Sequence, residues 1–242
     1  MTTARTYVDP DLLSIGRLVL EGEEHHHLSR VLRIRKGQPV SILDGQGSVG
    51  RAAIIEVAST KTVVEIEGIH RIEEERPRLH LFQALPRGAK MDHVVQWGVE
   101  LGAATIEPFS SRRSRPLDEA VERRIERWRK IAVESSRVAG RSYLPYIRRP
   151  LYWQEALEAL RDPEVVLIAD EAGGKRPAEA LKDLMPEDLG LIIGPEGGFT
   201  DTERKDLRGL GAIPVTLGDT ILRTETAGLV LLAAVRCHYK MI

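Results

Sequence analysis

The stretch LIIGPEGGFTDTE, from Leu191 to Glu203, decides the fold class of the second half of this chain. Its apolar start predicts a buried strand, and Thr200 and Glu203 have capping-box spacing, which predicts that a helix begins at Thr200. Gly194, Pro195, Gly197 and Gly198 lie between them. Open α/β sheets bind ligands beyond the carboxyl ends of their strands, and glycines let a ligand approach the main chain. This pattern favours a ligand loop, with an ordinary strand-to-helix turn as the alternative.

A second loop of similar character follows further along the chain. The segment VTLGDTILRTETAG, Val215–Gly228, connects a predicted strand to an apolar helix that Thr224 or Thr226 can cap. We expect the two loops to end adjacent strands and to form one pocket. An ordinary buried carboxyl-terminal helix is compatible with the same residues.

The usual nucleotide motifs are absent from these loops. No G-x-G-x-x-G follows a strand, and the Gly173-Gly-Lys-Arg segment lacks both the earlier glycine and the Ser or Thr of a phosphate loop. The sequence therefore argues against dinucleotide-binding and P-loop sites.

Outward from the loops, short apolar strands alternate with helical segments from Leu79 onward, which predicts an α/β domain with a mostly parallel sheet. The predicted strands are Leu79–Ala84, Thr105–Phe109, Val165–Ala169, Leu189–Ile193 and Ile213–Leu217. The predicted helices are Met91–Leu101, Leu117–Ala139, Trp153–Leu160, Pro177–Leu184, Thr200–Leu210 and Thr224–Tyr239.

The first 70 residues have a different pattern, of short alternating runs separated by Gly and Asp. The runs are Arg17–Leu20, Gln38–Leu43, Arg51–Val57 and Thr62–Ile66, with a turn at residues 44–47. They predict a small antiparallel barrel, interrupted by one helix over Glu23–Arg33 that places Leu28, Val31 and Leu32 on one side. The polar stretch from Ile72 to Arg78 is interpreted as a linker, so the predicted domains are residues 1–72 and 77–242.

Composition limits the class of protein. Hydrophobic residues make up 42% and charged residues 29% of the chain, and no apolar run approaches the roughly 20 residues of a membrane span. The amino terminus lacks the pattern of a secretory signal and Cys237 is the only cysteine, so we expect a cytoplasmic protein without disulfides.

Charge is segregated along the chain although the net charge is only −1. Residues 76–150 contain 16 Lys and Arg against 8 Asp and Glu, whereas residues 1–75 have 9 against 12 and residues 151–242 have 10 against 16. A basic block of this kind favours binding to a polyanion, with a solvated helix surface as the alternative.

Together these motifs resemble the RsmE family of ribosomal-RNA uridine-N3 methyltransferases, in the SPOUT superfamily. The resemblance lies in GPEGGF (Gly194–Phe199) and LGDTILRTETA (Leu217–Ala227), and it extends to HHLSRVLR (His26–Arg33) and QALPRGAKMD (Gln83–Asp92). The segments ELGA from Glu100 and RWRKI from Arg127 also fall where the family has similar motifs.

The resemblance implies a PUA-like barrel for RNA contact and an α/β domain whose end is threaded into a trefoil knot. It also implies a bent S-adenosylmethionine held largely by main-chain groups. The residues expected to bind this cofactor are Ile193, Gly194, Pro195, Glu196, Gly197, Gly198, Leu217, Gly218, Ile221, Leu222, Arg223, Thr226 and Ala227. The chain departs from the family at Arg112-Arg-Ser, where a Glu-Arg-Ser motif is usual, and at Val138, where the family usually has Gln.

Methylation of uridine N3 requires removal of its proton and stabilisation of the negative charge that spreads onto the ring oxygens. Arg223 and Arg137 are the candidate cations, and Glu225 and Glu134 are the candidate bases. Salt bridges and helix-surface positions are the alternative roles, and direct loss of the proton to water is also possible.

Phosphate neutralisation and guanidinium stacking are what structured RNA requires of a protein. The candidate RNA contacts are Arg30, Arg33, Arg87, Lys90, Arg112, Arg113 and Arg141. No metal site is expected, because adjacent histidines such as His25, His26 and His27 point in different directions on a helix.

The expected substrate is therefore small-subunit ribosomal RNA, either free or in the subunit, and the family resemblance implies a homodimer. Two alternatives stay open. One is a SPOUT methyltransferase that acts on another RNA, and the other is a non-catalytic ribosome-assembly factor that binds RNA.

Overall fold

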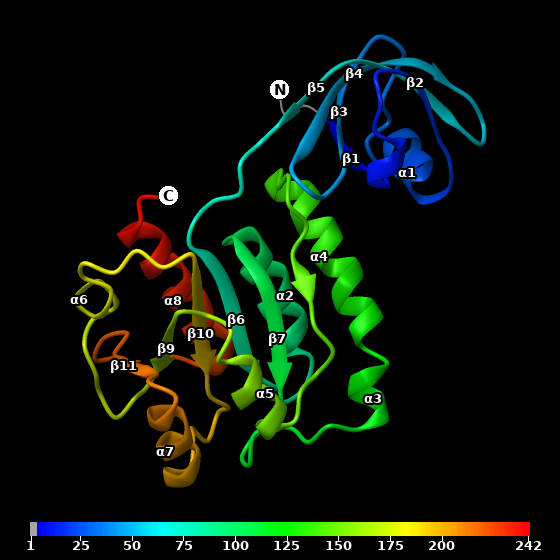
Figure 1. The fold of residues 1–242 in the computed structure, drawn as a ribbon. Coiled ribbons are helices and arrows are strands. Elements are labelled where there is room, and N and C mark those ends of the chain that lie inside the picture. The colour runs from blue at the N-terminus through cyan, green and yellow to red at the C-terminus, as the bar shows by residue number, and fades with distance from the viewer. Residues whose placement is uncertain (1–3) are drawn as a thin grey trace. The chain divides into compact units, whose positions relative to one another are not determined.

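A computed structural model describes residues 4–242 of the protein, apart from the side chain of Glu122. The chain divides into two compact units (Figure 1). The first contains Met1–Glu74 and Ser136–Leu144, and the second contains Glu75–Ser135 and Pro145–Ile242. The division between Glu74 and Glu75 falls inside the predicted linker. The sequence did not predict that residues 136–144 belong to the first unit.

The first unit is built on one five-stranded sheet with the order β1-β3-β4-β5-β2. Its strands are β1 (Ala4–Tyr7), β2 (Gly16–Leu20), β3 (Pro39–Leu43), β4 (Ser48–Val57) and β5 (Thr62–Arg71). The sequence predicted only antiparallel pairs, and this is wrong for β1, which pairs in parallel with β3. The short β1 pairs with a strand more than 30 residues away, so local patterns could not place it.

The segment predicted as one helix over Glu23–Arg33 is helical only as far as Val31, and it is α-helical only to His26. Helix α1 (Gly22–His26) continues as a π-helical turn, η2 (His27–Val31), and Arg33 then adopts a left-handed conformation with φ of 51°. The wider turn keeps Leu28 fully buried but leaves Val31 and Leu32 exposed.

Residues 136–144 belong to the first unit through hydrogen bonds to the turn at residues 44–47. The backbone of Gly47 donates to Ser142 at 3.0 Å, and Leu144 donates to Gly45 at 2.9 Å. The Asp44 carboxylate holds the turn by accepting from the backbone of Ser48 at 2.8 Å. The predicted turn is thus both a hairpin connection and the docking point for a distant segment.

The second unit is a six-stranded sheet, all parallel, with the order β11-β9-β10-β6-β7-β8. Its strands are β6 (Arg78–Ala84), β7 (Ala103–Phe109), β8 (Tyr146–Ile147), β9 (Val165–Ala169), β10 (Asp188–Ile193) and β11 (Ile213–Val215). The predicted parallel α/β domain is confirmed. The expectation that the two loops end adjacent strands is wrong, because β9 lies between β10 and β11.

Helices cover both faces of this sheet, as Figure 1 shows. Residues of α2 (Lys90–Glu100), α4 (Ile125–Ala139), α6 (Pro177–Ala180) and α8 (Thr224–His238) pack in one apolar core. Residues of α5 (Trp153–Ala159) and α7 (Asp201–Gly209) pack in the other. Strand residues alternate between the cores, since Leu79 and Leu81 belong to the first and Phe82 and Ala84 to the second.

Two predicted helices are shorter or broken. The helix predicted over Leu117–Ala139 is divided into α3 (Glu119–Glu122) and α4, and Asp118 caps α3 by accepting from the backbone of Val121 at 2.8 Å. The helix predicted over Pro177–Leu184 ends at Ala180, and Asp183 beyond it has a positive φ of 61°. Among the helices of residues 4–242, none has the length and apolar character that crossing a membrane requires.

A polar cluster lies on β6, β7 and β10, beside the second apolar core. His80 contacts Asp188 at 2.6 Å and Thr105 at 3.0 Å, and Arg148 forms an ion pair with Glu107 at 3.2 Å. Burial raises the pKa of the Glu107 carboxyl, and Arg148 and Thr105 only partly oppose this effect.

Candidate cofactor site

A cavity of about 510 Å³ lies where β9, β10 and β11 end. Its volume is within the range of small-molecule and cofactor sites. It is lined by residues 169–173, 193–196, 198–199, 204, 216–224 and 227. The cavity therefore lies at the carboxyl ends of three parallel strands, where open α/β sheets bind ligands.

Eleven of the thirteen residues expected to bind the cofactor line this cavity. The two that do not are Gly197 and Thr226. The two loops thus meet in one cavity as the sequence predicted, although the order of the strands differs from the prediction.

Sequence reasoning missed a third loop, residues 169–173, which follows β9. Because β9 lies between β10 and β11, its loop is brought to the middle of the cavity. The Asp170-Glu-Ala-Gly-Gly segment after an apolar strand was the available signal. Arg204 and Thr216 were also missed.

Two glycines of the first loop make room for neighbouring side chains. A Cβ atom on Gly194 would lie 3.0 Å from the Phe199 ring. Gly198 has a left-handed φ of 65°, and a Cβ there would lie 3.1 Å from Glu171 Oε1. These glycines therefore permit close packing of the loop against Phe199 and Glu171.

A buried hydrogen-bonded chain fixes the start of the first loop. The Gln83 Nε2 atom donates to Thr224 Oγ1 at 2.8 Å, and the Thr224 hydroxyl donates to the Gly194 carbonyl at 2.5 Å. Gln83 is fully buried and Thr224 is 5% exposed. These hydrogen bonds join the end of β6, the first residue of α8 and the loop after β10.

Lys90, the first residue of α2, links the first loop to the first turn of α8. Its ammonium lies 3.4 Å from Glu196 Oε1 and 3.2 Å from Glu225 Oε2. The backbone of Arg87 also donates to Glu196 at 3.1 Å. Burial opposes ionisation of Glu196, but hydrogen bonds from its own backbone, Arg87 and Lys90 outweigh it and lower the pKa of the carboxyl.

Arg204 connects the third loop to α7. Its guanidinium forms an ion pair with Asp170 and donates to the Phe199 carbonyl at 3.4 Å. Asp170 in turn accepts from the backbone of Ala172 at 3.0 Å. The charge of Asp170 is thus compensated within the site.

The loop after β7 contacts the first cofactor loop and α7. Arg113 donates to the Gly197 carbonyl at 2.8 Å, and the backbone of Arg112 donates to Glu203 at 2.8 Å. The other oxygen of Glu203 accepts from the backbone and hydroxyl of Thr200, both at 2.8 Å. The predicted capping box is therefore confirmed, and Glu203 also holds the loop that carries Arg112.

Of the four predicted catalytic residues, only Arg223 lines the cavity. Glu225 is bound by Lys90, and Glu134 is exposed on α4 outside the cavity lining. Arg137 is in the first unit, where its guanidinium pairs with Glu24 at 2.6 Å. All four assignments stay predictions.

Arg137 also lies 5.9 Å from the centre of the Tyr7 ring. Burial raises the pKa of Tyr7 to about 12, although Arg141, Arg137 and Arg5 oppose it. The neutral hydroxyl donates to the Arg141 carbonyl at 2.6 Å.

The predicted RNA contacts are divided between the two units. Arg30, Arg33 and Arg141 belong to the first, and Arg87, Lys90, Arg112 and Arg113 belong to the second. Only Arg141 and Lys90 are half-buried, and the others are exposed.

Among the side chains that the structure describes, no group of three or more His, Cys, Asp or Glu is arranged to hold a metal ion. His25 is buried and has a structural role, because its ring contacts Thr62 at 2.9 Å and the Ser59 carbonyl at 3.2 Å.

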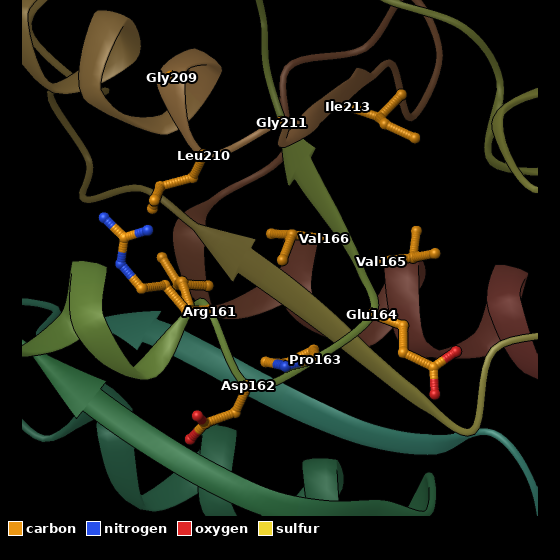
Figure 2. A pocket seen from close by; sticks show the side chains of 11 residues that line it. Arg161, Asp162, Pro163, Glu164, Val165, Val166, Gly209, Leu210, Gly211 and Ile213 are labelled. Carbon is orange, nitrogen blue, oxygen red and sulfur yellow. The ribbon is translucent and has the colours of Figure 1, made fainter.

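A second hollow, also of about 510 Å³, lies at the opposite end of β9 (Figure 2). It is lined by residues 160–166, 209–211 and 213. In Figure 2 the charged groups of Arg161 and Glu164 lie on opposite sides of the apolar Val166. No predicted site residue is part of this hollow.

Each of the two units contains a segment that matches a known protein domain. Residues 73–236 match an RNA methyltransferase domain, and residues 20–67 match an RNA methyltransferase PUA domain. The parallel sheet with its terminal cavity and the separate smaller unit therefore define an RNA methyltransferase that carries a PUA domain.

Two named relatives identify the family within this class of RNA methyltransferases. The chain is 31% identical over 234 residues to ribosomal RNA small subunit methyltransferase E of Synechocystis sp., covering 96% of this chain and 76% of the relative. It is 30% identical over 232 residues to the Bacillus subtilis protein of the same name, covering 92% and 91%. The chain belongs to the ribosomal RNA small subunit methyltransferase E family.

Solved structures agree with this assignment. The Neisseria gonorrhoeae protein of that name, bound to S-adenosyl methionine, has a TM-score of 0.85, with 29% identity and 98% coverage of both chains. A methyltransferase of Legionella pneumophila in complex with the bound cofactor SAM has a TM-score of 0.86, with 31% identity and 98% coverage of both chains.

Proposed function

We propose that this protein uses S-adenosylmethionine to methylate N3 of a uridine in small-subunit ribosomal RNA. The observation that carries the proposal is the cavity at the ends of β9, β10 and β11, in a chain of this family. A relative of the same fold was solved with S-adenosyl methionine bound, which supports the choice of cofactor.

The residues of the cavity suit this cofactor. Main-chain groups of Gly194 and of residues 217–222 would hold it, and the buried Thr224 would keep the Gly194 carbonyl in place. Ile193, Leu217, Leu222 and Ala227 provide apolar surface. When bound, the cofactor supplies a methyl group on a positively charged sulfonium.

The protein must orient the uridine and accommodate the negative charge that arises when N3 loses its proton. Arg223 lines the cavity and is exposed, so we assign to it the stabilisation of negative charge on the uracil oxygens. Glu225 lies two residues after Arg223, in the first turn of α8, but its carboxylate is engaged by Lys90 at 3.2 Å.

Glu134 and Arg137 lie outside the cavity lining, so neither is part of the cofactor cavity of its own chain. We propose a homodimer in which the partner completes the site. Size-exclusion chromatography with light scattering tests this, and a monomer at working concentrations would contradict it.

We also propose that the end of the second unit forms a trefoil knot, as the family resemblance implies, and that the protein works in the cytoplasm, where its substrate is assembled. The proposed RNA contacts are Arg30, Arg33, Arg87, Lys90, Arg112, Arg113 and Arg141.

The decisive experiment is nucleoside mass spectrometry of small-subunit RNA from cells that lack this protein. We expect 3-methyluridine to disappear, and purified protein with S-adenosylmethionine to restore it on isolated small subunits. Unchanged 3-methyluridine would reject the substrate.

A matched pair of variants tests the site itself. Arg223→Ala should reduce the restoration, whereas Arg161→Ala, another exposed arginine but in the second hollow, should leave it unchanged. Equal activity of the two variants would remove Arg223 from the mechanism.

A further inference from the structure

The cavity contains carboxylates of two kinds. Asp170 is paired with Arg204, and Glu196 is bound by Lys90 and the Arg87 backbone. Glu171 and Asp219 also line the cavity, and within the described part of the chain neither has an ion pair or a side-chain hydrogen bond.

Of these two free carboxylates, Glu171 has the more defined position. It lies on the loop after β9, and its Oε1 atom is 3.1 Å from the point where a Cβ of Gly198 would lie. The carboxylate therefore reaches across to the loop after β10. Asp219 lies in the exposed segment 218–220.

The guanidinium of Arg204 is paired with Asp170 and forms no ion pair with Glu171 among the described contacts. The lining side chains carry four negative charges, from Asp170, Glu171, Glu196 and Asp219, against two positive charges, from Arg204 and Arg223. Lys90, outside the lining, pairs with Glu196, and an excess of negative charge is still left when its charge is counted. A ligand with positive charge is favoured in such a cavity.

This charge distinguishes the two forms of the proposed cofactor. S-adenosylmethionine has a sulfonium cation, whereas the S-adenosylhomocysteine that remains after methyl transfer has an uncharged thioether in its place. The two ligands otherwise make the same contacts, so a carboxylate that attracts the sulfonium binds the donor more tightly than the product.

We propose that Glu171 is a specificity-determining residue that selects the methyl donor over the spent cofactor and so favours product exchange. This inference rests on the proposed function, since it requires that S-adenosylmethionine binds in the cavity.

The test is calorimetric titration of the full-length protein with S-adenosylmethionine and, separately, with S-adenosylhomocysteine. In Glu171→Gln we expect the Kd for the donor to rise about threefold to tenfold, because a partly exposed charge pair is screened by water, and the Kd for the product to change less than twofold. The matched comparison is Asp219→Asn, which should change the ratio of the two constants less than Glu171→Gln does.

Salt gives a second measurement. The preference of the unmodified protein for the donor should decrease between low and high ionic strength, and the ratio in Glu171→Gln should depend less on salt. Circular dichroism and the Tm should be the same for all three proteins, since both substituted side chains are exposed.

An equal loss of affinity for both ligands in Glu171→Gln would overturn the inference in favour of a structural role. Unchanged affinities, or an equal effect of Asp219→Asn on the ratio, would also overturn it. In those cases the proposed function stands, whereas an unmodified protein that binds neither ligand at millimolar concentration would reject the function as well.

Discussion

Replacing Thr224 by Val removes one buried hydroxyl and keeps the shape of the side chain. That hydroxyl donates to the Gly194 carbonyl at 2.5 Å and accepts from Gln83 Nε2 at 2.8 Å. Gln83 keeps its other bond, to the Ala84 carbonyl at 3.1 Å, so the main loss is at Gly194. A buried polar group left without a partner costs about 1–3 kcal/mol.

We therefore expect Thr224→Val to lower the free energy of unfolding by about 2 kcal/mol, which for a chain of this size is a Tm decrease of roughly 4–8 °C. The Kd for S-adenosylmethionine should rise, because the start of the first loop loses its anchor. Thermal unfolding and calorimetric titration measure the two effects. Thr202→Val, an exposed threonine on α7, is the control and should change neither quantity.

A double-mutant cycle with Gln83→Leu tests the reasoning further. Gln83 Oε1 is buried without a hydrogen-bond partner, so Gln83→Leu removes an unsatisfied atom together with the donor. We expect the double variant to be less destabilised than the sum of the single variants, by about 1 kcal/mol. Two results would refute this role of the Gln83–Thr224–Gly194 hydrogen bonds. One is a free energy of unfolding for Thr224→Val within about 0.5 kcal/mol of that of the parent, and the other is strict additivity of Thr224→Val with Gln83→Leu.

Three further predictions follow from other contacts of the second unit. Lys90→Met should raise the Kd for S-adenosylmethionine about threefold to tenfold, because Glu196 and Glu225 lose their common cation. If the variant loses affinity for RNA alone, Lys90 acts as the predicted RNA contact instead. Glu203→Gln should lower the free energy of unfolding by about 1–2 kcal/mol, since the amide nitrogen that replaces one carboxylate oxygen cannot accept and leaves Thr200 or Arg112 without its acceptor. An unchanged Tm would contradict this. The pKa of Glu107 is raised in the folded state, so its stabilising contribution should be present below the ordinary glutamate range and lost as pH rises through the raised value. Denaturant unfolding of the parent and Glu107→Gln measures this, and a difference that grows in favour of the parent with rising pH would have the wrong sign.

The second unit could be predicted well from its sequence because its signals are local. The apolar run Val165–Ala169 is a strand with those bounds, and the capping box at Thr200 and Glu203 starts α7. The glycine-rich loops identified the cofactor cavity for the same reason, since a strand, a turn and a helix start follow one another directly.

The features that could not be predicted from the sequence depend on contacts between residues that are far apart in the chain. The position of β9 between β10 and β11 is set by the sheet as a whole, and it brings Glu171 into the cavity. The parallel pairing of β1 with β3 is likewise long-range. Arg137 lies on an amphipathic helix like many others, and only the fold reveals that its partner is Glu24.

The return of residues 136–144 to the first unit has a consequence for protein engineering and for evolution by domain exchange. A fragment ending at Glu74 would lack Arg137, Ser142 and Leu144, and with them the partners of Glu24 and of the 44–47 turn. The PUA domain therefore cannot be excised by one cut, and a chimera with another PUA domain must exchange two pieces of chain together. Recombination at a single crossover would be selected against for the same reason.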